Sequence, residues 1–94
     1  MFDIRMKDHG EVALSGRFDA AQVEKARSVF DQLTTTTVVD FKELDYISSA
    51  GLGVLMATQK RLKDAGHKLR LKNVTGHIRD VFNIARFDLI FDIE

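Results

Sequence analysis

The chain has 94 residues, which is the size of one domain, since domains run from roughly 50 to 250 residues. It contains no cysteine, so disulfide-stapled scaffolds, thiol nucleophiles and cysteine metal sites are excluded. Its 14 basic and 14 acidic side chains give a formal net charge of zero, which argues against a general nucleic-acid-binding protein, because such proteins carry a large positive excess.

Charged side chains make up 30% of the chain, and no apolar run approaches the ~20 residues that are needed to cross a bilayer. The first seven residues alternate apolar and charged side chains, which is not the pattern of a signal peptide. We therefore expect a small, soluble, cytoplasmic domain that binds neither membranes nor nucleic acid.

The N-terminal third of the chain predicts a hairpin followed by a helix. Apolar and polar residues alternate over residues 2–6 and 12–15 on either side of a short glycine turn, which is typical of an antiparallel hairpin. We expect the second strand to end at Gly16. Asp19 stands three residues before a glutamine, the spacing of a capping box, and apolar residues recur with helical spacing over residues 20–33.

The middle of the chain predicts a short strand and then a loop. A β-branched run leads into Val38–Phe41, which favours a strand. Residues 42–48 are expected to form a loop, and its apolar residues Leu44 and Ile47 are expected to hold it against the body of the domain.

The C-terminal half predicts two helices and two strands. A helix is expected over residues 50–65, followed by an alternating strand at 67–72, a helix that Thr75 can cap, and a short edge strand in the apolar tail at 87–91. The predicted buried face of the first of these helices consists of Leu52, Leu55, Met56, Gln59 and Leu62. Apolar residues nearly encircle its first turns, which predicts either that Val54 or Met56 is exposed beside Ser49 or that these residues pack under the loop that contains Leu44 and Ile47.

This order of elements predicts an α/β fold. The sheet is expected to be mixed, with an N-terminal antiparallel hairpin followed by β-α-β-α-β-α and parallel pairing. Right-handed crossovers between strands laid side by side in chain order place the helices on the same face. Three strands alternate with charged residues, which is typical of a sheet with one open face. We therefore predict one domain over residues 1–94, with helices mainly on one face of the sheet.

The most informative segment carries two adjacent serines, Ser48 and Ser49, where the loop is expected to become a helix. A serine here can cap the helix, which stabilises it by about 1 kcal/mol over alanine. A helix N-terminus also attracts phosphate, so a phosphorylation site is the second interpretation. Gly51 and Gly53 remove side chains beside the hydroxyls, which allows either the approach of a partner's backbone or tight packing of the helix on the sheet.

Four segments in register resemble the motifs of the STAS domain family, and specifically those of the bacterial anti-sigma-factor antagonists. They cover nearly the whole chain, about residues 10–91. The segment Leu14–Asp19 resembles the L-x-G-x-(L/F)-D element, Asp40–Phe41 the D-(L/F) strand end, Ile47–Leu52 the (I/M)-(D/S)-S-(S/A/T)-G-L turn, and Ile78–Phe82 the late I-x-x-(V/L)-F helix. The resemblance implies a single STAS domain that acts by binding and is not an enzyme.

The resemblance also implies a mechanism. A serine-kinase anti-sigma factor with a histidine-kinase-like ATPase domain would phosphorylate Ser49, and a serine phosphatase would reverse the modification. The unphosphorylated form would bind the kinase and so release a sigma factor. Many relatives have aspartate where this chain has Ser48, so the Ser48 hydroxyl is the alternative acceptor. The implied partner-binding residues are Asp19, Asp40, Ser48, Ala50, Gly51, Leu52 and Gly53.

Two other functions need to be compared with this one. A stand-alone STAS module can also act as a scaffold or transporter regulator without sigma-factor control. An enzyme, such as a small phosphatase or nucleotide hydrolase, would need an acid–base or metal set that the sequence lacks. The three histidines show no metal-ligand spacing, and no cofactor is expected.

Overall fold

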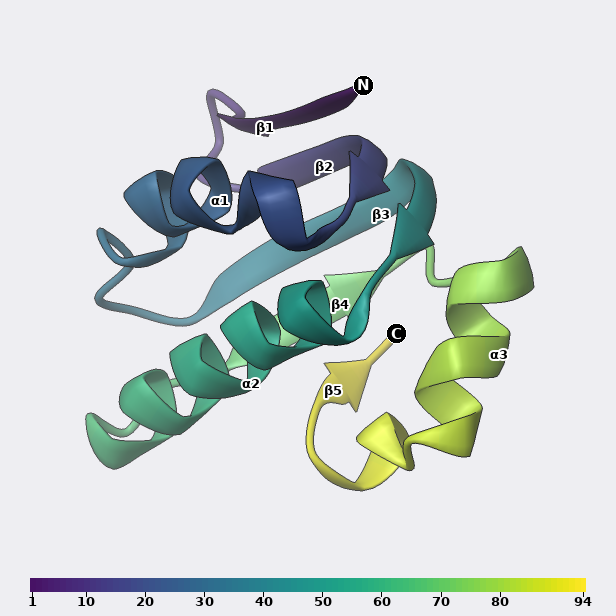
Figure 1. The fold of residues 1–94 in the computed structure, drawn as a ribbon. Coiled ribbons are helices and arrows are strands. Elements are labelled where there is room, and N and C mark those ends of the chain that lie inside the picture. Colours follow the sequence, from purple (N-terminus) through teal and green to yellow (C-terminus); the bar gives the residue numbers. More distant parts are fainter.

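The computed structural model describes all residues from 1 to 94 and contains one five-stranded sheet and three α-helices (Figure 1). The strands are β1 (Phe2–Met6), β2 (Val12–Phe18), β3 (Thr37–Ile47), β4 (Leu69–Lys72) and β5 (Asp92–Ile93). The helices are α1 (Val23–Phe30), α2 (Ser49–Asp64) and α3 (Gly76–Ile84), with 3-10 turns η1 (Ala20–Gln22) and η2 (Phe87–Leu89). No helix combines the length and the apolar character that crossing a bilayer requires.

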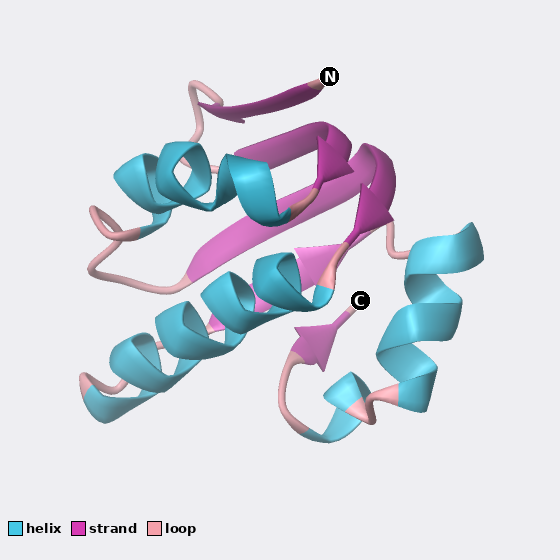
Figure 2. Cartoon of the chain, in the orientation of Figure 1, coloured by secondary structure: helices cyan, strands magenta, loops and turns pink.

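The strands lie in chain order, β1-β2-β3-β4-β5, and the sheet is mixed. The hairpin β1–β2 is antiparallel, whereas β2–β3, β3–β4 and β4–β5 are parallel. Helices α1 and α2 lie side by side over one face of the sheet, and α3 stands at its edge (Figures 1 and 2). This confirms the predicted fold class, in which crossovers of one hand place the connecting helices on the same side.

The core is a single cluster of 22 buried apolar side chains between the sheet and the helices. Leu69 and Leu71 of β4 are fully buried, as their alternation predicts. The ring of Phe82 on α3 meets that of Phe41 on β3 edge to face at a centroid distance of 5.5 Å, so α3 is held against the same core.

Strand β3 runs to Ile47, so the prediction of a loop over 42–48 is wrong. The pairing with β2 explains the error. Two steps along β2, from Ala13 to Ser15, match three steps along β3, from Asp40 to Glu43, and a second such shift follows. Each extra residue in β3 is a bulge that moves later side chains to the other face, so the period-two pattern is lost in the sequence. Leu44 and Ile47 are nevertheless buried, as expected.

Strand β2 continues past Gly16 to Phe18, so Gly16 does not end the strand. Gly16 has φ +79°, and a Cβ on it would lie 1.5 Å from the carbonyl oxygen of Met1. Only glycine fits this backbone and this close approach. Gly16 therefore forms a kink within β2, and the strand continues after the kink because Arg17 and Phe18 still pair with β3.

Helix α1 is shorter than the predicted span of 20–33 at both ends. Asp19 caps the 3-10 turn η1, since its carboxylate accepts a hydrogen bond from Ala21 N–H at 3.2 Å. At the other end, the guanidinium of Arg61 on α2 donates to the carbonyl oxygens of Phe30 and Leu33 at 2.8 and 2.7 Å. Leu33 stays buried although it lies outside the helix.

Helix α2 confirms its prediction within one residue at each end, but its buried face is rotated. Met56 belongs to the predicted buried face but is 43% exposed, whereas Val54 is buried. This confirms the separate prediction that one of these two residues is exposed. The helix packs against α1 as well as the sheet, which selects a different set of positions. The buried positions are Gly51, Val54, Leu55, Thr58, Gln59 and Leu62.

The apolar tail differs from its prediction. Residues 87–89 form the turn η2, and the strand β5 begins only at Asp92. The amide of Phe91 donates to the carbonyl of Phe87 at 2.8 Å, which closes a helical turn, and the two phenylalanines bury their rings together at 5.2 Å. This helical spacing of aromatic residues, which the sequence shows, outweighs the strand propensity of the segment.

Candidate functional site

Ser48 connects the end of β3 to the start of α2 and caps the helix. Its backbone is extended, with φ −88° and ψ 170°, and its Oγ accepts a hydrogen bond from Gly51 N–H at 3.2 Å. Its own N–H donates to the carbonyl of Phe18 at 2.9 Å, so the ends of β2 and β3 are held together at this point. The Ser48 hydroxyl is thus engaged in the local structure.

Ser49 is the first residue of α2 and its side chain is exposed. Its hydroxyl makes no hydrogen bond within the chain. The unpaired N–H groups and the positive end of the helix dipole surround this position, which favours a negative group there. The two adjacent hydroxyls therefore have different environments, one within a cap and one open to an external enzyme.

The two glycines of the turn also differ. Gly51 is buried, and a Cβ on it would lie 2.9 Å from Cγ1 of Ile47 and 3.1 Å from the Phe18 carbonyl oxygen, so the helix requires glycine to pack here. Gly53 is exposed, and a Cβ on it would have no neighbour within 4 Å. A mid-helix glycine costs about 1 kcal/mol relative to alanine, and nothing within the chain requires Gly53.

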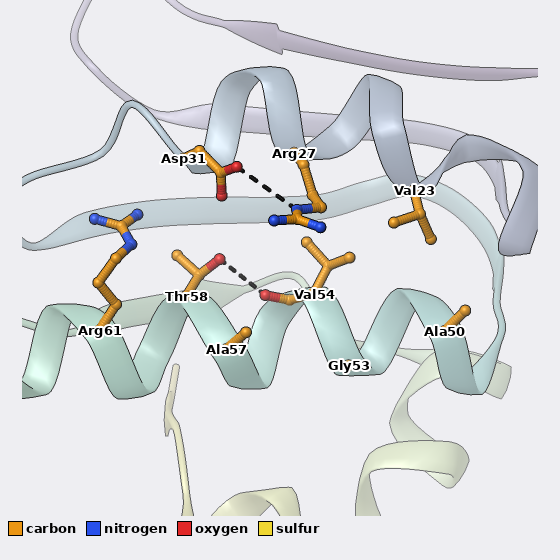
Figure 3. A pocket seen from close by; sticks show the side chains of 9 residues that line it. All are labelled: Val23, Arg27, Asp31, Ala50, Gly53, Val54, Ala57, Thr58 and Arg61. Atoms are coloured by element: carbon orange, nitrogen blue, oxygen red, sulfur yellow. Dashed lines mark hydrogen bonds and ion pairs between the residues drawn. The ribbon is translucent and has the colours of Figure 1, made fainter.

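A groove of about 490 Å³ runs between α1 and α2 and begins beside Ser49 (Figure 3). Small residues of α2 at helical spacing form its floor, and longer side chains of α1, including the Arg27–Asp31 ion pair at 3.6 Å, form its wall. The lining residues are Val23, Arg27, Asp31, Ala50, Gly53, Val54, Ala57, Thr58 and Arg61. The spacing of Ala50, Gly53 and Ala57 is visible in the sequence, whereas the contribution of α1 depends on how the two helices pack.

The structure brings most of the predicted partner-binding residues together. Asp19 is half-buried and directly follows Phe18, whose carbonyl binds Ser48. Ala50 and Leu52 are half-buried on the first turn of α2, and Leu52 N–H donates to the Ser48 carbonyl at 2.9 Å.

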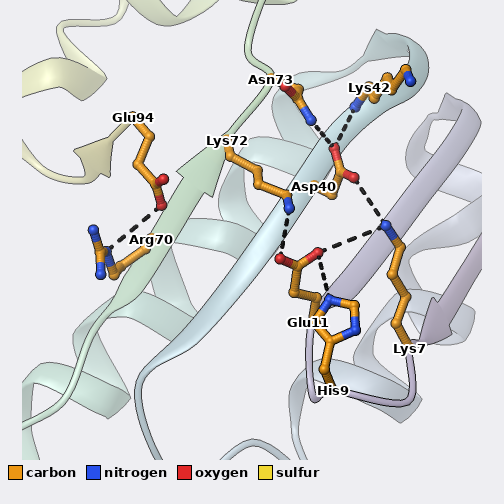
Figure 4. A network of polar contacts seen from close by, with 9 residues as sticks. All are labelled: Lys7, His9, Glu11, Asp40, Lys42, Arg70, Lys72, Asn73 and Glu94. Atoms are coloured by element: carbon orange, nitrogen blue, oxygen red, sulfur yellow. Dashed lines mark hydrogen bonds and ion pairs between the residues drawn. The ribbon is translucent and has the colours of Figure 1, made fainter.

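Asp40 lies elsewhere. It is buried seven residues before Ile47, roughly 20 Å away along the strand at about 3.3 Å per residue, on the face that the helices leave open. Its carboxylate accepts hydrogen bonds from Lys7 Nζ at 3.1 Å, Asn73 Nδ2 at 2.8 Å and Lys42 N–H at 3.0 Å (Figure 4).

Contacts on this open face shift the pKa values of three charged side chains, Asp40, Glu11 and Lys72. Burial alone would raise the pKa of Asp40, but the hydrogen bonds from Asn73, Lys42 N–H and Lys7 outweigh it and hold the pKa below its ordinary value of 3.8. The Lys72 ammonium, 2.6 Å from Glu11, lowers the pKa of Glu11, and Glu11 in turn raises the pKa of Lys72 (Figure 4). This cluster ties the turn between β1 and β2 to β3 and to the end of β4, so it helps to hold the sheet together.

The structure contains no cluster of three or more histidine and carboxylate side chains placed to hold a metal ion. The exposed Ser49 hydroxyl, which makes no hydrogen bond within the chain, can be presented as an acceptor to an external enzyme.

The family described as "Mlab, STAS domain" matches residues 2–92. The chain therefore belongs to the STAS domain family.

The similar proteins include regulators of sigma factors. A putative anti-sigma factor antagonist, BtrV of Bordetella bronchiseptica, is 39% identical over 74 residues, which cover 79% of this chain and 58% of BtrV. This chain thus spans little more than half the length of that relative.

A putative anti-sigma factor antagonist from Thermotoga maritima has a TM-score of 0.80 at 20% identity, covering 99% of this chain and 85% of that one. The Bacillus cell fate determinant SpoIIAA in its phosphorylated form has a TM-score of 0.71 at 21% identity, covering 100% and 91%. Both structures support the shared fold.

Proposed function

We propose that this STAS domain is an anti-sigma-factor antagonist whose partner binding is controlled by phosphorylation of Ser49. In the unphosphorylated state it binds a serine-kinase anti-sigma factor and so frees a sigma factor. Phosphorylation releases the partner, and a serine phosphatase restores the binding form. The observation that carries the proposal is the exposed, unengaged Ser49 hydroxyl at the start of α2, beside a Ser48 hydroxyl that is occupied as a cap.

The similar proteins support this proposal from two directions. The name of BtrV assigns it a putative role as an anti-sigma factor antagonist, and SpoIIAA exists in a phosphorylated form. A STAS domain with an acceptor hydroxyl at a helix N-terminus fits both descriptions.

The physical effect of phosphate on such an interface is large. A phosphate adds about −1.5 to −2 charges at pH 7, and burying it opposite a partner that offers no counter-charge costs several kcal/mol. A loss of about 3–4 kcal/mol weakens binding several hundredfold. The fold need not change, because the phosphate sits at the positive end of α2.

Gly53 is further evidence that a partner binds the surface around Ser49. Its backbone is bare, it lies on the floor of the groove one turn from Ser49, and the chain's own packing does not require it. Glycine at position 53 weakens the helix, and close approach of a partner to the α2 backbone would explain why it is there.

The direct test is mass spectrometry of the chain after incubation with a purified serine-kinase anti-sigma factor and ATP. We expect one phosphate on the wild type and on Ser48→Ala, and none on Ser49→Ala. Phosphate on Ser48 alone would show that Ser48, and not Ser49, is the acceptor. If no such kinase of the source cell phosphorylates the chain, the proposal is wrong.

Binding provides a second test. Ser49→Asp and Gly53→Ala are expected to fold normally and to bind the kinase at least tenfold more weakly than the wild type, while Lys63→Ala, at the far end of the same helix, binds unchanged. Wild-type affinity in Ser49→Asp would contradict the switch, and a membrane transporter or multi-copy scaffold as the chief partner in pull-downs would favour the alternative function.

A further inference from the structure

A row of three stacked side chains lies at the end of the sheet where β3 leads into α2. The guanidinium carbon of Arg17, on β2, is 4.2 Å from the centroid of the Tyr46 ring on β3. The imidazole of His77, on α3, lies parallel to the same ring within 10°, at a centroid distance of 6.4 Å. The Tyr46 ring is therefore contacted by a cation from β2 and by an aromatic ring from α3.

Arg17 has no counter-ion within the chain. The chain has seven arginines. Five of them have polar partners: Arg27, Arg70 and Arg86 pair with carboxylates, and Arg61 and Arg79 donate to backbone carbonyls. Only Arg5 and Arg17 make neither kind of contact. The tyrosine fixes the orientation of the Arg17 guanidinium while its N–H donors stay free, an arrangement suited to a ligand outside the chain.

This row borders the Ser49 turn. Arg17 pairs with Tyr46 in the register of β2 and β3, and the next contacts along the two strands are Phe18 with Ile47 and then Ser48 N–H with the Phe18 carbonyl. A standard protein interface covers about 800 Å² on each partner, so a protein centred on Ser49 also covers residues two or three positions away.

We infer that the row Arg17–Tyr46–His77 is a binding hot spot for the protein that recognises Ser49, and that this partner places a carboxylate side chain on the Arg17 guanidinium. The inference rests on the proposed function, because it takes the Ser49 turn as the centre of the interface. Tyrosine and arginine are the residues most often found at hot spots, and a pre-oriented guanidinium binds a carboxylate through two parallel hydrogen bonds with little loss of side-chain freedom.

The test measures association and dissociation rates of the chain with a purified serine-kinase anti-sigma factor, for the wild type, Arg17→Gln and Arg5→Gln. Arg5 is the matched control, since it is also unpaired but lies four register positions away, beside Ala13. We expect Arg17→Gln to bind roughly thirtyfold more weakly, mainly through faster dissociation, and Arg5→Gln to change affinity less than twofold. Arg17→Lys keeps the charge but loses the planar fork, so we expect most of the loss to remain.

The outcomes separate this inference from the proposed function. If the wild type binds and is phosphorylated on Ser49 while Arg17→Gln binds within threefold of it, the inference is wrong and the proposed function stands. Equal losses in Arg17→Gln and Arg5→Gln indicate a general charge effect and also overturn it. If the wild type neither binds the kinase nor accepts phosphate, both are wrong. Circular dichroism melting checks that Arg17→Gln, a change at an exposed residue, folds like the wild type.

Discussion

Two neighbouring serines of the same chemistry have different roles because the backbone changes conformation between them. Ser48 is extended and its hydroxyl binds back to the helix, whereas Ser49 is the first helical residue and its hydroxyl is free. We expect Ser48→Ala to lower the free energy of unfolding by about 1 kcal/mol and Ser49→Ala to change it by less than about 0.5 kcal/mol. Urea denaturation of the two variants measures the difference, and equal losses would contradict the assignment of the cap.

The two glycines of the same turn predict opposite changes in stability. Gly51→Ala introduces a methyl against the Phe18 backbone and Ile47, so it should destabilise the chain by about 1–3 kcal/mol. Gly53→Ala enters open space and should stabilise the helix by up to about 1 kcal/mol. Thermal melts of both variants test this, and a destabilised Gly53→Ala would show that Gly53 has a structural role that its surroundings do not reveal.

At the scale of single residues, the sequence identifies the segment that contains Ser48 and Ser49 but not which serine forms the cap and which is free. The pair of serines before two glycines is visible as a cap or an acceptor site, and the motif resemblance favours Ser49. Which hydroxyl forms the cap depends on where the helix begins, and a shift of one residue exchanges the two roles. Likewise, only the position of Phe18 and Ile47 around α2 separates Gly51 from Gly53.

Among the elements, the kinked strand β2 depends most on a single residue. Gly16→Ala would combine a left-handed backbone with a clash against the Met1 carbonyl, and we expect a loss of at least about 2–3 kcal/mol. Gly10→Ala is the matched control, since Gly10 also has a positive φ, +85°, but open space around it, and should cost only about 1 kcal/mol. Similar losses in the two variants would show that the clash is relieved by a small shift of Met1.

Regular periodicity decides which elements could be predicted. The hairpin, α2 and β4 follow simple patterns of apolar residues, and their predictions are confirmed within one or two residues. The length of β3 could not be predicted, because its bulges appear only when it is paired with β2. The end of α1 depends on Arg61, which is 31 residues away from Phe30 in the sequence.

For the whole molecule, the charged cluster on the open face predicts sensitivity to acid. The pKa values of Asp40 and Glu11 are lowered in the folded state, so the stability that they contribute is complete above their ordinary values of 3.8 and 4.5 and is lost as the pH falls through the lowered values. Lys72, whose pKa is raised, contributes below its ordinary value of 10.5 and loses its contribution as the pH rises beyond it.

Thermal melts from pH 7 to pH 2 test the acid side. We expect Asp40→Asn to melt below the wild type at pH 7 and the gap between the two to close as the pH falls below 3.8, because the wild-type carboxylate is then neutral as well. Asp8→Asn, at an exposed carboxylate without a partner, should follow the wild type throughout. A gap that stays constant with pH would mean that Asp40 acts through shape and not through its charge.

The site as a whole was predicted in part. The residues around Ser49 are contiguous in the sequence or belong to the preceding strand end, so a motif can find them. The wall that α1 forms and the row of Arg17, Tyr46 and His77 come from separate elements that meet only in the folded sheet. Asp40 shows the reverse case, since the motif places it near the serine while the structure places it in the cluster that joins the strands.

The fastening of Met1 to the kinked strand has a practical consequence for constructing reporters. The Met1 carbonyl accepts a hydrogen bond from Arg17 N–H at 2.9 Å, so a dye attached to residue 1 is held next to Arg17, one register position from Phe18. A dye at residue 1 should therefore respond when a partner docks on Arg17.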